Sequence, residues 1–190
     1  MRGDPQGAVI IGASAGALEA LSVLLPSLPA DSPFPIFVIV HLPPTRRSVL
    51  AEIFDRKCAL RAIEAEDKEP VEPGVIYFAP PNYHLLLEGR TEISLSTEEE
   101  VFFSRPSIDV AFESAADAWG DRLTGIILTG ANQDGAKGLQ SVQRSGGTAI
   151  VQDPVDAYAT AMPEAAIRAC PEADVMTLPE ISTFLQNLLP

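Results

Sequence analysis

The stretch AVIIGASAGALEALSVLL (residues 8–25) sets the architecture expected for this 190-residue chain. Residues 8–12 form a short apolar run that predicts a strand, and the small residues after it predict a tight turn. The leucines that follow recur at the spacing of one helical face: Leu18, Leu21, Leu24 and Leu25. A strand, a turn and a helix in this order begin a βαβ unit.

The same succession recurs along the chain. Further apolar strands are predicted at residues 35–41, 123–128, 148–152 and 174–177. Helices are predicted at about residues 46–57, 107–119, 136–145, 163–169 and 179–189. Strands that alternate with helices predict an α/β, doubly wound fold, with a mostly parallel sheet and helices on both faces.

The middle of the chain has a different pattern. Residues 75–79, 84–88 and 92–95 are short apolar pieces, separated by turn signals such as Pro73-Gly74 and Glu88-Gly89. This spacing predicts an antiparallel hairpin at one edge of the sheet. Because no linker or repeat interrupts the pattern, we expect one domain over residues 1–190.

Composition excludes several classes of function. The chain has 26 acidic and 13 basic residues, hence a formal charge of −13 and a pI near 4.4. Sequence-independent nucleic-acid binding and adhesion to anionic lipid both need an excess of cations, so neither is expected. No apolar run reaches the roughly 18 residues of a membrane span, and residues 1–7 lack a signal-peptide core. We therefore expect a cytoplasmic protein without membrane insertion, in which Cys58 and Cys170 are buried thiols.

Three chemically able side chains follow three predicted strands. Ser14 comes after the first strand, His41 ends the second, and Asp134 lies in the loop after the strand at residues 123–128. In an open parallel sheet, ligands bind at the carboxyl ends of the strands, and these ends share one edge. The sequence therefore predicts that a serine, a histidine and an aspartate lie on the same edge.

Ser14 lies between Gly12 and Gly16 in a Gly-x-Ser-x-Gly pattern, the spacing of a nucleophile elbow. The glycines permit a sharp turn, and the start of the next helix offers free N–H groups for a developing oxyanion. The alternative is a plain tight turn in which Ser14 caps the helix.

His41 is placed to take a proton from a neighbouring hydroxyl, with a hydrogen-bonded structural histidine as the alternative. His84 opens a hairpin strand, where surface packing is expected. Asp134 is the candidate partner of the His41 imidazole, with capping of its own helix as the alternative. Asp153 and Asp156 also follow a strand and remain acidic candidates.

A nucleotide-binding domain is a competing interpretation. The turn at residues 12–17 follows a strand and precedes a helix, as a pyrophosphate cradle does. However, the turn lacks a full Gly-x-Gly-x-x-Gly, and His41 stands where an acidic residue is expected.

The chain resembles the catalytic domain of the chemotaxis receptor methylesterases, the CheB type. The resemblance spans about residues 9–185 and rests on six blocks in the same order: residues 11–16, 38–43, 73–80 with His84, 104–109, 128–138 and 161–166. Ala15, Ala17 and Ala131 depart from the side chains usual in this family. Because backbone donors survive such changes, activity is still expected.

The resemblance implies hydrolysis of glutamate methyl esters on the cytoplasmic helices of chemoreceptors, and in some members deamidation of glutamine. It assigns Ser14 as nucleophile, His41 as general base and acid, and Asp134 as orienting carboxylate. The amides of Ala15 and Ala131 would hold the oxyanion. No cofactor or metal is implied, and the implied partners are methyl-accepting chemoreceptors with a separate response regulator or histidine kinase. A non-catalytic signalling module that keeps the fold remains the alternative function.

Basic residues gather just after His41, at Arg46, Arg47, Arg56, Lys57 and Arg61. Because an acidic receptor helix would be repelled by a uniformly negative enzyme, we expect this stretch to form a local positive face near the site. Arg46 and Arg47, with Met162 from the last block of the resemblance, are the predicted substrate contacts. The acidic stretches at residues 64–72 and 98–100 are expected to lie elsewhere.

Overall fold

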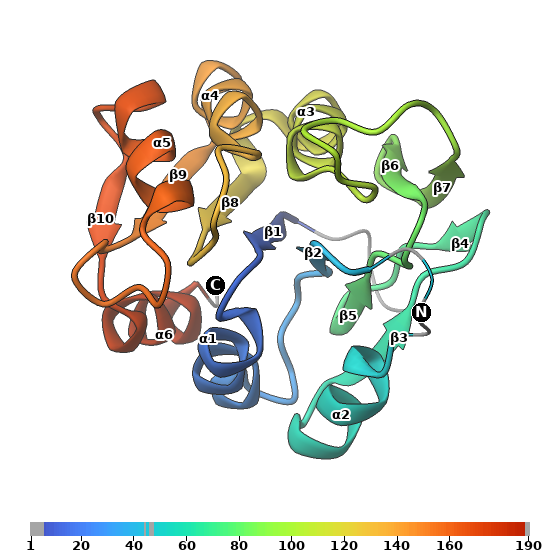
Figure 1. Cartoon of the computed structure of the whole chain (residues 1–190). Coiled ribbons are helices and arrows are strands. Elements are labelled where there is room, and N and C mark those ends of the chain that lie inside the picture. The colour runs from blue at the N-terminus through green and yellow to red at the C-terminus, as the bar shows by residue number, and fades with distance from the viewer. Residues whose placement is uncertain (1–5, 44, 46–47, 189–190) are drawn as a thin grey trace.

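A computed structural model of the chain describes residues 6–43, 45 and 48–188. This part contains a seven-stranded sheet whose strands all pair in parallel (Figure 1). Its spatial order is β10 (Asp174–Met176), β9 (Thr148–Gln152), β8 (Leu123–Ile127), β1 (Ala8–Ala13), β2 (Ile36–Val40), β5 (Val75–Phe78) and β3 (Arg61–Glu64).

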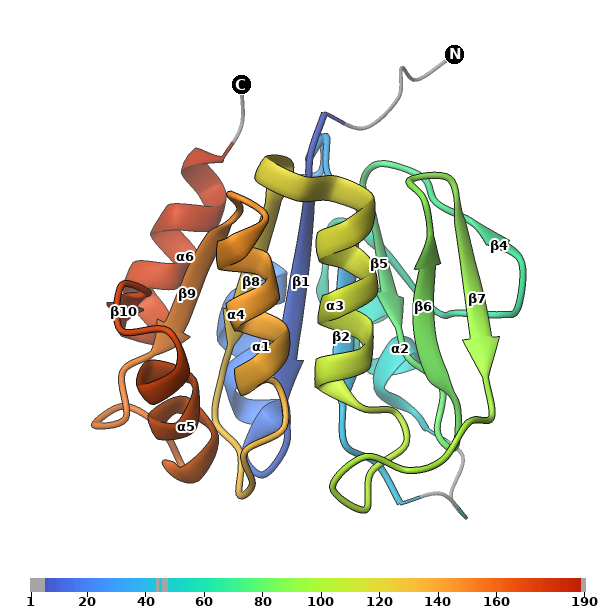
Figure 2. The ribbon, with the colours of Figure 1, turned by 90° about the horizontal axis from the view of Figure 1, so that it is seen from above.

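Helices cover both faces of this sheet, as Figure 2 shows. One face carries α3 (Ile108–Trp119), α4 (Ala136–Arg144) and α5 (Ala161–Ala169), and the other carries α1 (Ala17–Leu24), α2 (Leu50–Lys57) and α6 (Leu178–Asn187). Two 3₁₀ turns, η1 (Leu25–Ser27) and η2 (Gly120–Arg122), complete the helical elements. The predicted doubly wound α/β fold is confirmed.

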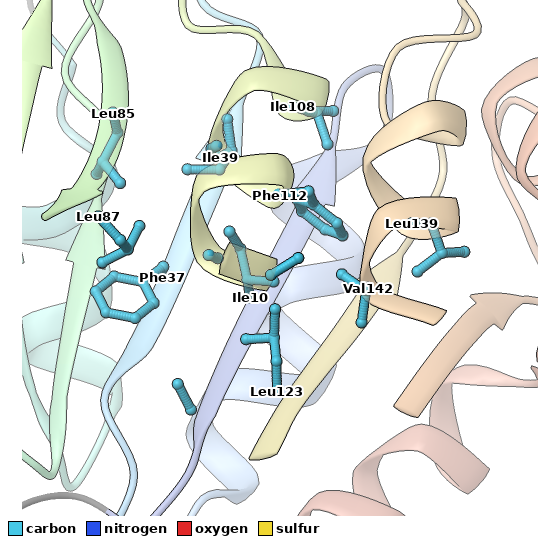
Figure 3. Packing of buried hydrophobic residues seen from close by; sticks show 14 of the residues in the cluster. Ile10, Phe37, Ile39, Leu85, Leu87, Ile108, Phe112, Leu123, Leu139 and Val142 are labelled. Carbon is cyan, nitrogen blue, oxygen red and sulfur yellow. The ribbon is translucent and has the colours of Figure 1, made fainter. Parts of the chain in front are cut away.

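The core alternates residue by residue along the central strands. Ile10 and Phe37 pack with Phe112 beneath α3 (Figure 3), whereas Ile11 and Val38 belong to the core beneath α1. Alternate side chains of a strand point to opposite faces, so both faces of a central parallel strand are apolar. Each fully buried side chain of this size contributes roughly 1.5–3 kcal/mol relative to exposure.

The hairpin forms a sheet of its own. Strands β4 (Glu69–Pro70), β7 (Glu92–Ser96) and β6 (His84–Glu88) pair antiparallel in that order, beside α3. The predicted hairpin is confirmed, but β5 joins the large parallel sheet, because its four residues are all buried.

Four local features differ from the predictions. Helix α2 begins at Leu50, later than predicted, and α5 begins at Ala161, two residues before the predicted start. Strand β3 was not predicted, because an edge strand with an exposed or half-buried pattern lacks an apolar run. Leu18 is 42% exposed and lies off the buried stripe of α1.

The order of the strands reverses at β1. From β1 the chain passes to β2 on one side, and it later returns to β8 on the other side. Such a reversal is the position at which α/β sheets bind ligands, at the carboxyl ends of the strands. Among the described residues, no helix has the length and apolar character that crossing a membrane requires.

Candidate active site

Ser14 follows β1 in a turn whose glycines are sterically required. The Ser14 amide donates to the carbonyl of Thr129 at 2.9 Å, which ties the turn to the end of β8. A Cβ on Gly12 would lie 2.5 Å from Cγ2 of Ile108, and a Cβ on Gly16 would lie 2.6 Å from Cβ of Tyr158. Gly16 also has a φ of +83°, a region that glycine adopts without cost.

The Ser14 side chain does not cap α1. The N-cap of α1 is Gly16, and no side chain bonds to the free amides there. The capping alternative for Ser14 is therefore wrong. Within the part of the chain that the structure describes, the Ser14 hydroxyl has no hydrogen bond to protein, so it is available for chemistry.

His41 lies opposite Ser14 across neighbouring strands. Ala13 pairs with Val40, and the His41 amide donates to the Ala13 carbonyl at 3.3 Å. Continued by one residue, the alternation of β1 and β2 places Ser14 and His41 on the α3 face, the face of Ile10 and Phe37. The His41 side chain is 11% exposed.

Asp134 joins His41 to the start of α3. Its Oδ2 lies 2.7 Å from Nε2 of His41 and accepts a hydrogen bond of 2.7 Å from the Ile108 amide. Its Oδ1 accepts from the Asp109 amide at 2.9 Å and from the Ser107 hydroxyl at 3.0 Å. The alternative that Asp134 caps its own helix is wrong: the N-cap of α4 is Gly135, and Asp134 instead binds the first amides of α3.

Asp134 is held as a carboxylate although it is fully buried. Burial alone would raise its pKa, but the hydrogen bond from His41 and those from two amides lower the pKa below its usual value. The ionised carboxylate of Asp134 accepts a hydrogen bond from the N–H group at Nε2 of His41. In this tautomer the free lone pair of the imidazole is on Nδ1. Nδ1 is thus the nitrogen available as a base for Ser14.

Asp109 is a buried carboxyl that the sequence analysis did not select. It is 5% exposed and its Oδ1 accepts from the amides of Gly135 at 2.9 Å and Gly138 at 2.7 Å. Burial raises its pKa to about 6, against the lowering effect of the Gly138 hydrogen bond. The available signal was an acidic residue in the first turn of a predicted helix, which does not reveal contact with another helix.

His84 is buried rather than packed at the surface, so that expectation is wrong. It is 1% exposed; its Nε2 donates to the Glu99 carbonyl at 2.9 Å, and its Nδ1 accepts from the Ser107 amide at 3.1 Å. His84 therefore holds Ser107, whose hydroxyl binds Asp134. The Glu99 carbonyl that His84 contacts belongs to the acidic stretch at residues 98–100, in the loop that precedes α3.

The loops beside Ser14 are held by hydrogen bonds that leave two backbone amides unused. The Gly130 amide donates to the Ala159 carbonyl at 3.1 Å, and the Thr129 hydroxyl donates to the Ala15 carbonyl at 2.8 Å. These bonds fix the two loops beside Ser14. In the described part of the chain, the amides of Ala15 and Ala131 donate to no protein group, as free oxyanion donors would.

The remaining candidates have different surroundings. Met162 is 1% exposed and packs on Gly130, where an added Cβ would lie 2.6 Å from its sulfur, so its burial favours a packing role. Arg46 and Arg47 lie outside the described residues. Asp153 and Asp156 accept from the amides of Val155 and Leu178, and Cys170 is buried while Cys58 is partly exposed.

The site contains no metal-ligand cluster. No group of three or more His, Cys, Asp or Glu side chains within residues 6–43, 45 and 48–188 is arranged to hold a metal ion. The chemistry available in the described site is that of a serine hydroxyl, an imidazole, a carboxylate and free amides.

Known proteins share this arrangement of elements. The crystal structure of the Thermotoga maritima CheB methylesterase catalytic domain matches with a TM-score of 0.91 and 33% identity, over 96% of this chain and 98% of that one. A Leptospira interrogans protein, provisionally named a protein-glutamate methylesterase/protein-glutamine glutaminase, is 44% identical over 95% of this chain and 94% of its own length. The Symbiobacterium thermophilum protein-glutamate methylesterase/protein-glutamine glutaminase is 35% identical over 94% of this chain and 49% of its own length.

The family model for CheB methylesterase matches residues 9–185, which span all the described strands and helices except the first residue of β1 and the last two residues of α6. The resemblance inferred from six separate blocks is thus confirmed over the same residues. The chain belongs to the CheB methylesterase family.

Proposed function

We propose that this chain hydrolyses the methyl esters of glutamate side chains on the cytoplasmic helices of chemoreceptors, as part of chemosensory adaptation. The observation that carries the proposal is the bond of 2.7 Å between His41 and the buried carboxylate Asp134. Ser14 supports it, because it follows the paired ends of β1 and β2, as His41 does, and its hydroxyl has no hydrogen bond to the described part of the chain. Relatives named for protein-glutamate methylesterase activity support it.

In the proposed reaction Ser14 Oγ attacks the ester carbonyl while Nδ1 of His41 takes the hydroxyl proton. Asp134 stabilises the imidazolium that forms, and the amides of Ala15 and Ala131 hold the oxyanion. His41 then gives the proton to the departing methoxide, which leaves as methanol. A water molecule, deprotonated by His41, cleaves the acyl-enzyme and returns a glutamate carboxylate and the Ser14 hydroxyl.

The same steps release ammonia instead of methanol when the acyl group is the amide of a glutamine side chain. The relatives are also named for protein-glutamine glutaminase activity, so we propose deamidation as a second reaction of this site.

The wider assignments are also proposals. Two core clusters on the two faces of one large sheet support a single catalytic domain over residues 1–190. We propose the cytoplasm as its location, and a separate response regulator or histidine kinase as the component that controls it. Arg46 and Arg47 remain the proposed substrate contacts, whereas Met162, buried against Gly130, would act through packing. Charge reversal of Arg46 and Arg47 should slow turnover on receptor helices.

The deciding experiment measures methanol release from methylated receptor helices. Ser14→Ala should lose about a hundredfold or more of the activity with its fold retained, because removing a nucleophile leaves only binding and oxyanion stabilisation. Ser145→Ala, at the C-terminal end of α4, is the matched control. Equal release by wild type and Ser14→Ala would contradict the proposal and favour the non-catalytic signalling module.

A further inference from the structure

We propose that Phe102, Phe103, Lys137 and Arg168 form a docking surface for an acidic segment of the protein that carries the target glutamate. This inference rests on the proposed function and names the part of the surface that recognises the substrate protein. We call these four residues the aromatic-cationic surface.

The first observation is an unusual turn. Val101 and Ser104 exchange two backbone hydrogen bonds of 3.1 and 2.9 Å around Phe102 and Phe103. The two phenylalanines have φ values of +50° and +59°, the signature of a type I′ turn. Such turns favour Asn-Gly, and bulky residues in this region each cost roughly 1–2 kcal/mol.

Burial cannot offset this cost for both side chains. Phe103 is 98% exposed and Phe102 is 37% exposed. A strained turn that presents aromatic side chains to water is unfavourable for folding alone, so it points to a surface that becomes covered when a partner binds.

The second observation is a hollow next to the site. It has a volume of about 350 Å³, and Phe102, Gln133, Ala136, Lys137 and Arg168 contribute to its walls. Gln133 and Ala136 flank Asp134 and Gly135 in the chain, and Asp109 also lines the hollow. A protein segment lying here would therefore run beside the loop that carries Asp134 and Ala131.

The third observation is charge. Lys137 and Arg168 are exposed, and no ion pair to either is present among residues 6–43, 45 and 48–188. Asp109, the carboxylate that lines the same hollow, accepts hydrogen bonds from the amides of Gly135 and Gly138. In a chain with a charge of −13, two unpaired cations beside the site attract an acidic segment that the rest of the surface repels.

The chemistry of the substrate fits this surface. The reaction converts an ester into a glutamate carboxylate, so a protein with several such sites becomes more acidic as it is processed. Aromatic side chains supply apolar contact area and the two cations supply attraction and register. The occupant is thus an acidic protein segment with an apolar face, next to the residue that enters the site.

The test compares a protein ester with a small ester. Wild type and variants are assayed on methylated receptor helices and on the γ-methyl ester of an N-acetylglutamyl amide. Lys137→Glu with Arg168→Glu should raise KM for the receptor helices by about tenfold. The ratio of kcat/KM for the receptor helices to kcat/KM for the small ester should fall by about tenfold as well. Arg144→Glu, in the last turn of α4, is the charge-reversal control and should leave both values unchanged.

The aromatic turn has its own variant. Phe102→Asn with Phe103→Gly gives the residues that a type I′ turn prefers, so Tm should rise while KM for the receptor helices rises by about tenfold. A higher Tm with an unchanged KM would show that the phenylalanines do not bind substrate, and would overturn the proposal.

The remaining outcomes are also decisive. If the variants of the aromatic-cationic surface keep the wild-type ratio of kcat/KM for the receptor helices to kcat/KM for the small ester, the docking proposal is wrong while the proposed function stands. If wild type hydrolyses neither ester, the proposed function itself fails. If the wild type is a dimer that Phe102→Asn with Phe103→Gly dissociates, the surface binds a second copy of the chain, and the docking proposal is overturned.

Discussion

The carboxylates of Asp109 and Asp134 each bind the start of the other residue's helix, through hydrogen bonds from the first backbone amides there. Asp134, just before α4, binds the amides of Ile108 and Asp109 in α3, and Asp109 binds the amides of Gly135 and Gly138 at the start of α4. The start of a helix attracts negative charge and has unpaired amides, so each carboxylate satisfies both needs of the opposite helix. This exchange fixes Asp134 where it meets His41.

His41→Gln should reduce the rate of methanol release by about a hundredfold or more, with the fold retained. The amide of glutamine can still donate to Asp134, but it cannot accept the proton of Ser14. Circular dichroism checks the fold. His41→Gly should recover part of its activity when imidazole is added, and a His41→Gln variant with wild-type activity would contradict the role of His41.

His84→Ala should lower stability, since it leaves the amide of the buried Ser107 without a partner. The expected loss for this unsatisfied group is about 1–3 kcal/mol, measured by denaturant unfolding. Tyr83→Ala, at the exposed neighbouring position, is the control. If His84→Ala has wild-type stability, His84 does not anchor Ser107.

Gly12→Ala should destabilise the protein by about 1–3 kcal/mol through overpacking. The added Cβ would lie 2.5 Å from Cγ2 of Ile108 at the start of α3. Because Ile108→Ala removes that carbon, the double variant should be more stable than the sum of the two single effects predicts. Strict additivity would show that α3 does not meet β1 at Gly12.

Asp109→Asn should change how stability depends on pH. The folded protein holds the pKa of Asp109 at about 6, against 3.8 for an ordinary aspartate, so between these values it binds more protons than the unfolded chain. The stability that this carboxyl contributes is fully present below pH 3.8 and is lost as pH rises through about 6. The asparagine does not titrate and loses no such contribution. The Tm of the variant minus the Tm of wild type should therefore increase as pH rises over this range.

The control for this experiment is Asp117→Asn, on the exposed side of the same helix. Thermal unfolding of both variants and of wild type at about pH 4, 5, 6 and 7 gives the differences. A Tm difference between Asp109→Asn and wild type that is constant with pH would show that Asp109 has an ordinary pKa.

Local patterns in the sequence sufficed for the strand-turn-helix succession and for Ser14, His41 and Asp134. Apolar runs, glycines and the position after each strand are properties of neighbouring residues, and the carboxyl ends of parallel strands share one edge. For the same reason β3 was missed, since an edge strand with a mixed pattern has no local signal.

The sequence by itself determined the α/β class, the edge of the sheet on which the candidate site lies and the three residues proposed to act there. Only the tertiary structure decided that Nε2 of His41 faces Asp134, that Asp109 and Asp134 exchange helix starts, and that His84 is buried behind Ser107. Each of these contacts joins residues that are far apart in the chain. Their hydrogen bonds depend on how α3 and α4 pack on the sheet, and no periodicity within one segment encodes that packing.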